Sequence, residues 1–574
     1  MLLDYEACLE SMGRVRVLLD LLLSLVRQWV DAIGFHPRPA PGRPALAAGL
    51  YAPLYASAVQ GPLTPYELSR GFVLSVLLIS SFWYLEYPQR TSPGELLKMI
   101  ASMRLRDAAS GARAHKDIVI QDVTIVDLER GTLLAHKTVV IQNGTIVDVG
   151  TAKAAASRPE ADVVDGHGKF LIPGLWDMHS HITHTDVDFP LYIANGVLGI
   201  RSMGGIQEEV FRWQLELRDG SLLGPLAFVS GPILDAPNGP VQPASYGVRI
   251  ANAKEARTEV DKLKAQGADF VKVYDGLSRE SYFAIAEEAK RVGLPFAGHV
   301  PGRVTIMEAV DAGQRSIEHG IEDRAESTAE QELMDRNQKE DFMAEAMKTG
   351  NFKLIPEGIA RNGNTWLKNF SQERADSLYR TLAAKKVYLC PTLGVQRWTA
   401  YGDEMASKPD ARQRYIDPKT LVYWAPSMNM LTKYRTPAYK DWVKVRYAKH
   451  LEQIPRQQGL GVQLLAGTDL TVPYTYPGSS VHDEVRLFAE AGLTPLAALQ
   501  TATTHPVAFF GLQNKLGSVS AGKLAEIVLL DGNPLSDLHS LDQIDAVITH
   551  GQVFRKAELQ AMMATAAAVA QDHK

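Results

Sequence analysis

Strand-like runs alternate with segments of helical periodicity through the middle of this 574-residue chain, and this alternation constrains its fold more than any other feature. The eight runs are GLWDMHSHI, GVLGIRSMGG, PLAFVSGPIL, DFVKVYDG, PFAGHV, RSIEHG, KVYLCPTLG and QLLAGTDL. Between two of them, Ser278 can cap a helix over residues 279–291, and Gly293 lies just past its end. The pattern predicts an α/β fold, a (β/α)8 TIM-like barrel over residues 173–510, with functional residues at the carboxyl ends of its strands.

Short β-branched runs flank this region on both sides. DIVIQDVTIVD and TVVIQNGTIVDVG precede it, and the Asn143-Gly144 pair in the second run is a strong hairpin signal. AEIVLLDGNP and DAVITHGQVF follow it. We therefore expect a composite β-sandwich domain, built from residues 116–172 and 515–560 around the central domain.

Residues 1–110 differ from the rest and form an N-terminal helical, apolar extension of unknown role. Residues 2–33 are Leu-rich, and a Pro/Gly/Ala stretch over residues 37–53 is typical of a linker. The uncharged run 71–85 has 15 residues, whereas a membrane-spanning helix needs about 20. Three interpretations stay open: a helical segment packed on the main body, membrane association through residues 1–90, or a misassigned start codon.

Charge and cysteine content restrict the partners and the ligands. The net charge of -5 supplies no basic surface for nucleic acid, so nucleic-acid partners are excluded. The two cysteines, Cys8 and Cys390, lie too far apart for a CxxC metal site, so any metal must be held by His, carboxylate or modified Lys. A homo-oligomer is expected, and the compartment stays open between cytoplasmic and membrane-associated or exported.

Polar residues gather at the ends of five of the eight runs, and these candidate ligands are His179, His181, Lys272, His299, His319 and Asp469. Residues two apart in a strand point to the same side, so His179 and His181 can face the barrel mouth together. Lys272 lies inside the apolar run DFVKVY, where an unpaired ammonium costs several kcal/mol. Together these residues predict a metal site.

The motifs GLWDMHSHI, VKVYDG, AGHV, IEHG and AGTD resemble those of the metal-dependent amidohydrolase superfamily. The flanking NGTIVDVG, KFLIPG and GKLAEIVLLDGNPL resemble its β-sandwich, and the likeness covers residues 116–554. It is greatest to imidazolonepropionase-related, prolidase-like members with a carboxylated lysine. The resemblance implies that Lys272 carries a CO2-derived carbamate bridging two Zn²⁺ or other divalent ions. His179 and His181 with Asp469 would hold one ion, and His299 and His319 the other.

The resemblance also implies a reaction, the hydrolysis of an amide C–N bond. A hydroxide that bridges the two metals attacks, and Asp469 shuttles the proton. The expected substrate is a small amide, a dipeptide of the Xaa-Pro type or an N-acyl amino acid. Tyr274 lies on the same strand face as Lys272, so its hydroxyl is expected to bind the substrate carboxylate, unless it only packs at the barrel rim.

Other functions stay open because the chain departs from the family pattern at three places, which leave the predicted ligands intact and the substrate undecided. Arg201-Ser202 stands where many relatives have Arg-Asp, His505-Pro506-Val507 replaces Asn-Pro-Ala, and Glu526 stands where Asp is common. The alternatives are a lactonase or phosphotriesterase with the same metals, a mononuclear deaminase, and a non-catalytic scaffold.

Two long connections and two further histidines are less informative. Residues 321–386 and 396–462 are too long for simple barrel helices, and they form either lids over the site or surface helices that bury their own aromatic residues. His184 and His482 are expected to be solvated loop residues.

Overall fold

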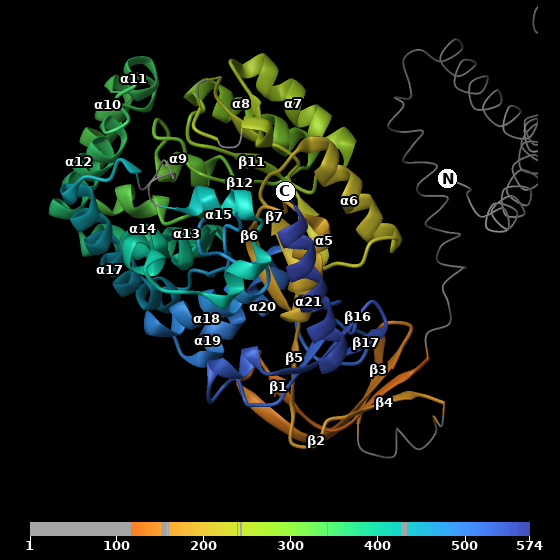
Figure 1. The fold of residues 1–574 in the computed structure, drawn as a ribbon. Helices are drawn as coiled ribbons and strands as arrows, with labels where there is room; N and C mark the ends of the chain where they lie inside the picture. The colour runs from red at the N-terminus through yellow and green to blue at the C-terminus, as the bar shows by residue number, and fades with distance from the viewer. Residues whose placement is uncertain are drawn as a thin grey trace, which may run out of the picture. The chain divides into compact units, whose positions relative to one another are not determined.

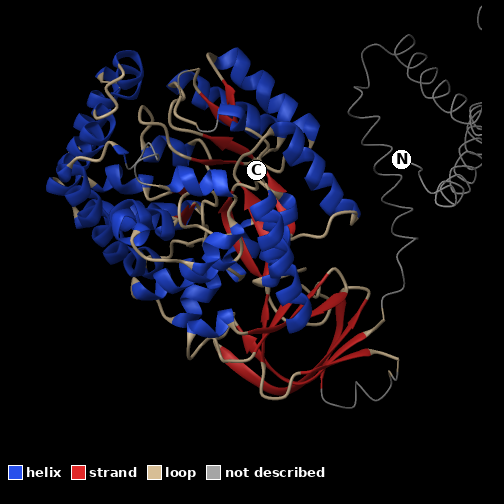
Figure 2. Cartoon of the chain, in the orientation of Figure 1, coloured by secondary structure: helices blue, strands red, loops and turns tan. Residues whose placement is uncertain are grey.

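The computed structural model describes residues 116–150, 158, 160–237, 239–241, 244–340, 342–425 and 433–573. The expectations for residues 2–33, 37–53 and 71–85, and for Cys8, therefore lie outside the described residues. The described chain is a mixed α/β protein (Figure 2). Within it, no helix has both the length and the apolar character that crossing a membrane requires.

An eight-stranded mixed sheet is built from segments at both flanks of the central region (Figure 1). Its strands are β1 (Ile118–Asp127), β2 (Thr132–Gln142), β3 (Thr145–Gly150), β4 (Asp162–Asp165), β5 (Phe170–Pro173), β15 (Ile527–Leu530), β16 (Ile544–Thr549) and β17 (Gln552–Arg555). Strands β2 and β3 form the hairpin that Asn143-Gly144 predicts, because both residues adopt positive φ, 48° and 72°. The sheet carries an apolar core of its own.

The remaining strands are parallel and form two ladders. In spatial order, the three strands of the first ladder are β6 (Leu175–Ser180), β7 (Val197–Ser202) and β8 (Leu226–Val229). The six strands of the second ladder are β10 (Gly247–Arg249), β9 (Ile233–Asp235), β11 (Val271–Val273), β12 (Phe296–Gly298), β13 (Ser316–Glu318) and β14 (Tyr388–Cys390). Single backbone hydrogen bonds continue past the ladders. Asp269 N donates to Val229 O, Leu465 N to Leu389 O, and Met178 N to Ala466 O, each at a distance of 2.8 Å.

Two of the expected strands differ from their sequence patterns. PLAFVSGPIL is divided into β8 and β9 at Gly231-Pro232, because Gly231 adopts a φ of 74° and proline has no N–H for a ladder. QLLAGTDL forms no regular strand. It makes isolated parallel bridges from Leu464 to Leu389 and from Leu470 to Val472, and single backbone hydrogen bonds join it to β6, β14 and α19.

Helices surround the parallel strands (Figure 1). Those of ordinary length are α5 (Thr185–Ala194), α6 (Gln207–Asp219), α7 (Ala253–Gln266), α8 (Arg279–Val292), α9 (Ile306–Asp311), α18 (Ser479–Glu490), α19 (Pro495–Thr501), α20 (Thr504–Phe509) and α21 (Lys556–Asp572). Helix α8 begins as expected, since the Ser278 hydroxyl accepts a hydrogen bond from Ser281 N, and it ends at Gly293 with a φ of 64°.

The two long connections are helical. The first contains η3 (Ile321–Glu326), α10 (Glu330–Lys339), α11 (Phe342–Thr349), α12 (Leu354–Lys368) and α13 (Gln372–Lys385). The second contains α14 (Leu393–Ala406), η4 (Ala411–Tyr415), α15 (Pro418–Trp424) and α17 (Pro437–Gly459). Helices α12 and α17 pack against each other and bury aromatic residues such as Tyr439 and Trp442 between them.

Candidate metal centre

The six residues that the sequence places at strand ends lie within or next to the parallel strands. His179 is in β6 and Lys272 in β11, whereas His181, His299 and His319 follow β6, β12 and β13 directly. Asp469 follows the extended segment beside β6, and its backbone N donates to His179 O over 2.6 Å. The carboxyl ends of neighbouring parallel strands meet at one edge, which explains why residues 290 positions apart become neighbours.

The structure brings these side chains together. Lys272 Nζ lies 3.4 Å from His179 Nε2, and Asp469 Oδ1 lies 3.3 Å from both His179 Nε2 and His181 Nε2. The ring of His319 is 4.6 Å from that of His179 and 4.7 Å from that of His299, measured between centroids. His179, His319 and Asp469 each offer one ligand atom within 4.8 Å of the others. The cluster is therefore compact enough to share cations.

Each of the four histidines is held through its Nδ1 atom. His179 Nδ1 donates to Glu318 Oε2 over 2.9 Å, His181 Nδ1 to Gly204 O over 2.9 Å, and His299 Nδ1 to Asp275 Oδ2 over 3.0 Å.

The fourth histidine, His319, has a hydroxyl as its partner. Its Nδ1 lies 2.8 Å from Thr392 Oγ1, and because that hydroxyl donates to Pro391 O, its oxygen accepts from the imidazole. With every Nδ1 protonated, each neutral ring keeps its lone pair on Nε2. This tautomer is the one that a metal-binding imidazole requires.

Glu318 fixes His179 from behind, and the sequence analysis did not identify it. Its carboxylate is fully buried and also accepts two hydrogen bonds from Arg201 Nη2, over 2.9 and 3.0 Å. Arg201 in turn donates to Ser316 Oγ over 2.7 Å. A buried arginine–carboxylate pair with such contacts orients the imidazole and compensates for the desolvation of both charges.

The charges of the cluster alter its protonation. Burial lowers the pKa of Lys272 to about 8, so a substantial fraction of its amine is neutral near physiological pH. Burial also lowers the pKa of His179 and of His319 well below that of a free imidazole. Burial alone would raise the pKa of Asp469, but His319, His181 and Lys272 lower it below its usual value. The carboxylate is therefore ionised and both rings are neutral.

Backbone strain also gathers at this centre. His319 and Asp469 adopt left-handed conformations, with φ of 64° and 54°. A non-glycine residue in this region costs about 1–3 kcal/mol and is found where surrounding contacts impose it, often at functional sites. Here the strain turns both side chains toward the cluster instead of continuing the strand direction.

Tyr274 lies beside the cluster. Its ring stacks on that of His299 with 4.1 Å between centroids, and Lys272 Nζ lies 5.9 Å from its centroid. Burial and the neighbouring Asp275, Asp469 and Asp235 raise its pKa well above that of a free tyrosine, so the hydroxyl keeps its proton and can donate.

The expectation that His482 is solvated is wrong. It is a buried residue of α18, and its two ring nitrogens contact Asp542 Oδ1 and Asn195 O, each at 2.8 Å. Its role is to join helices, because neither nitrogen is available to a substrate. His184 is partly exposed, as expected for a loop residue, but it contacts other titratable groups.

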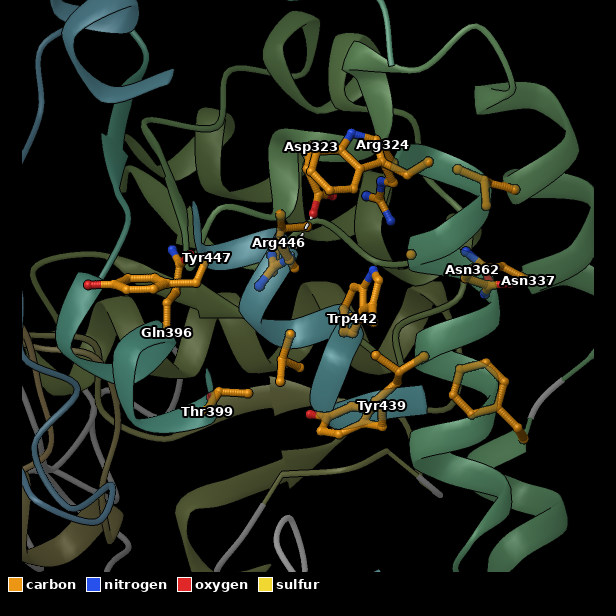
Figure 3. Close-up of a pocket in the computed structure, with 17 residues that line it drawn as sticks. Asp323, Arg324, Asn337, Asn362, Gln396, Thr399, Tyr439, Trp442, Arg446 and Tyr447 are labelled. Carbon is orange, nitrogen blue, oxygen red and sulfur yellow. Dashed lines mark hydrogen bonds and ion pairs between the residues drawn. The ribbon is translucent and has the colours of Figure 1, made fainter. Parts of the chain in front are cut away.

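A cavity of about 380 Å³ lies among η3, α12, α14 and α17 (Figure 3). Trp366, Tyr439 and Trp442 supply its aromatic lining, and Asp323 and Arg446 supply charges. Its volume is within the range of small-molecule sites.

The cavity adjoins the metal-ligand candidates through the backbone. Arg446 Nη2 donates to Gly320 O over 3.1 Å and to His319 O over 3.3 Å, and Arg446 Nε pairs with Asp323 over 3.0 Å. Trp442 Nε1 is buried and makes no hydrogen bond to any described residue. This indole N–H is therefore a donor that the described residues leave unsatisfied.

Comparison with known proteins places this geometry in context. Ochratoxinase from Aspergillus niger is 24% identical over 451 residues, which are 67% of this chain and 75% of that protein. The solved structure of bottromycin amidohydrolase superposes with a TM-score of 0.59 at 20% identity, over 84% of this chain and 94% of that one. A Xaa-Pro dipeptidase with bound methionine in its active site gives 0.53 at 18% identity, over 77% and 100%. These likenesses support the fold.

The family model with the description "Amidohydrolase family" matches residues 170–554, well over half of the chain and inclusive of all six strand-end residues. The chain therefore belongs to the amidohydrolase family, and it is a hydrolase that acts on carbon–nitrogen bonds.

Proposed function

We propose that the protein is a binuclear metal-dependent amidohydrolase that cleaves a dipeptide or an N-acyl amino acid. One observation carries the proposal: the Nδ1 atoms of all four histidines are hydrogen-bonded to residues other than the six candidate ligands. Their Nε2 lone pairs are therefore free to bind cations beside Asp469 and Lys272. Imidazole and carboxylate donors suit Zn²⁺ and related divalent ions.

The donors fit two cations when Lys272 is carbamylated. The neutral amine of Lys272 adds to CO2, forms an N–C bond and releases one proton, which leaves an anion with two oxygens. His179, His181 and Asp469 would hold one cation, His299 and His319 the second, and the Lys272 carbamate both. His299 Nε2 is buried and makes no hydrogen bond to any described residue, as expected of an atom reserved for a metal.

The reaction assigns a separate task to each residue. Bound divalent ions would lower the pKa of water and polarise the scissile carbonyl. The ionised Asp469 carboxylate is the base that accepts the proton of the attacking water and returns it to the leaving amine. Glu318 keeps His179 oriented, and the Tyr274 hydroxyl donates to the carboxylate of the substrate.

We also propose that the two parallel ladders are parts of one (β/α)8 barrel. The hydrogen bonds that continue past the ladders, from β8 toward β11 and from β14 through the 464–466 segment to β6, support closure. The amidohydrolase neighbours support the same architecture. In such a barrel all six ligands would lie at the same, carboxyl-terminal rim.

The cavity supports a substrate with a bulky apolar group on one side of the amide. Its aromatic walls and its position next to the backbone of His319 suit the side chain of a dipeptide or the acyl group of an N-acyl amino acid. The names of the related proteins, an Xaa-Pro dipeptidase and ochratoxinase, are compatible with a substrate of this class.

A substrate panel tests the function. Enzyme supplied with Zn²⁺ and bicarbonate would be incubated with dipeptides, N-acyl amino acids, lactones, phosphotriesters and aminopurines. We expect about two bound ions per chain and hydrolysis of the amides. One ion or none in active enzyme would contradict the binuclear centre, and activity confined to lactones, phosphotriesters or aminopurines would replace the amide substrate with an ester or deaminase function.

A further inference from the structure

The last helix of the chain ends beside the loop that follows the paired histidines. Helix α21 runs from the eight-stranded sheet along α5, and its end lies near α15 (Figure 1). Apolar residues join α5, η4 and α21 in one buried cluster made of Val187, Leu191, Tyr415, Ala566 and Ala570. Gln571 Nε2 donates to Arg414 O and Ile416 O, each over 3.1 Å. The end of α21 is therefore held in place by contacts that do not involve His573, the residue that follows it.

Four potential metal ligands converge at this junction. His184 and Asp186 come from the loop after β6 and the first turn of α5, His573 follows α21, and Asp417 precedes α15. One ligand atom from each of His184, Asp186 and His573 lies within 4.8 Å of the other two. Asp417 uses Oδ1 to cap α15, and its Oδ2 lies 3.9 Å from His184 Nε2.

One donor pair of this cluster has the spacing of a tetrahedral cation site, and the His184–Asp417 pair is wider, at 3.9 Å. His573 Nε2 lies 3.4 Å from Asp186 Oδ2, and the rings of His184 and His573 have centroids 4.4 Å apart. Ligand distances of about 2.0–2.2 Å place neighbouring donors of a tetrahedron about 3.4 Å apart. His573 Nε2 is buried and makes no hydrogen bond to any described residue. Small side-chain movements would bring two imidazoles and two carboxylates onto one ion.

We propose that His184, Asp186, Asp417 and His573 form a divalent-cation site, separate from the strand-end cluster. Two carboxylates and two neutral imidazoles would neutralise a 2+ ion, and oxygen and nitrogen donors of this kind suit Zn²⁺. The ion would fasten the C-terminal helix and the second long connection to the loop after β6, in which His184 lies three residues after His181. Its role is structural, because it joins segments far apart in the chain and not substrate to enzyme.

Metal content measured on the full-length protein tests the site. Wild type, His573→Ala and Asp186→Asn would be dialysed against Zn²⁺ at graded concentrations, and bound metal counted per chain. Both positions are partly or largely exposed, so both variants are expected to fold. Each should bind about one ion fewer than wild type. The difference in bound metal between wild type and each variant reports on this site alone. The test therefore works even if the strand-end cluster binds no metal.

His136→Ala is the matched control. His136 also pairs with an aspartate at the surface, Asp122 at 2.7 Å, but it belongs to none of the groups with ligand geometry among the described residues. It should bind as much metal as wild type.

Hydrogen exchange of the segment 565–573 supplies a second measurement. Zn²⁺ should slow exchange in wild type and leave it unchanged in His573→Ala. Equal metal content in wild type and both variants, or equal protection with and without Zn²⁺, would overturn the proposal and leave an ordinary His–Asp ion pair.

Discussion

The strand-end cluster and the cavity between helices lie on either side of the His319 backbone, and they are built on opposite principles. In the cluster, buried charges neutralise one another, and partners such as Glu318 and Thr392 fix the side chains in one orientation. In the cavity, aromatic walls enclose space, and a buried indole N–H has no hydrogen-bond partner among the described residues. The cluster is organised for a single chemistry, whereas the cavity offers shape and apolar surface. Reactivity and specificity should therefore respond to different substitutions.

Asp469→Asn, a change within the strand-end cluster, should give the largest loss of turnover among these substitutions. The amide is close in shape to the carboxylate but cannot accept the proton of the attacking water. We expect turnover to fall by about 10²- to 10⁴-fold, while much of the bound metal is retained because the histidines remain.

The measurement combines steady-state kinetics with metal analysis, and the exposed Asp311→Asn serves as control. Near-normal turnover in metal-loaded Asp469→Asn would remove the residue from its proposed role.

Glu318→Gln tests whether the support behind the cluster matters as much as the ligands. Loss of the carboxylate leaves the Arg201 guanidinium buried without a counter-charge, which should destabilise the protein by about 3–5 kcal/mol. His179 also loses its anionic acceptor, so metal affinity should fall by about 10- to 100-fold.

Ser316→Ala separates these two effects. Ser316 accepts from Arg201 and donates to Glu318 Oε1 but has no hydrogen bond to His179, so its loss should lower stability and weaken metal binding far less than Glu318→Gln does. Denaturant unfolding and metal titration measure both. If Ser316→Ala weakens metal binding as much as Glu318→Gln does, Glu318 acts only on general stability.

These two residues also show what the sequence could predict. The strand-end ligands follow from a period of two, from their position after apolar runs and from the cost of burying Lys272, all of which are local properties. Glu318 stands one residue before His319 in a quoted motif, but its contact with His179 depends on how β13 lies relative to β6, which no local pattern gives. The tautomers of the histidines depend on partners between 23 and 139 residues away.

The arrangement of the two long helical connections was still less predictable from the sequence. Its aromatic composition indicated either a lid or buried surface helices, and the structure contains features of both, since the aromatic residues pack together and also line a cavity. The packing of α12 on α17 creates this space, and helix periodicity alone does not say which helix faces which. The sequence pattern also predicts an eighth strand at QLLAGTDL. In the structure this segment bends at Asp469 and makes isolated bridges instead of a regular strand.

Tyr274→Phe tests whether a residue beside the strand-end cluster takes part in substrate recognition, and its effect should be of intermediate size. If the hydroxyl donates to the substrate carboxylate, its removal should lower kcat/KM by about tenfold or more on a carboxylate-bearing substrate. The same substrate with its carboxylate converted to an amide should be affected less. Equal losses on the two substrates would assign Tyr274 to packing against His299, and not to recognition.

Gly363→Ala should give the smallest effect on chemistry and the clearest effect on the cavity. A Cβ at Gly363 would lie 1.8 Å from Trp442 Cε2 and 1.9 Å from its Nε1, so the indole must move from its place against α12. We expect a loss of stability of about 1–3 kcal/mol and a several-fold loss of kcat/KM on substrates with a bulky apolar group. Substrates with a small group should react as before, because the strand-end ligands are untouched.

Gly459→Ala in α17 is the matched control for this substitution, since a Cβ there meets no atom within 4 Å. Because alanine is the better helix former, this control should be neutral or stabilising by up to about 1 kcal/mol. Kinetics of both variants on a pair of N-acyl amino acids, one with a small and one with an aromatic acyl group, would measure the difference. If Gly363→Ala slows both substrates equally, the cavity does not select substrates, and the division between reactive centre and specificity pocket fails.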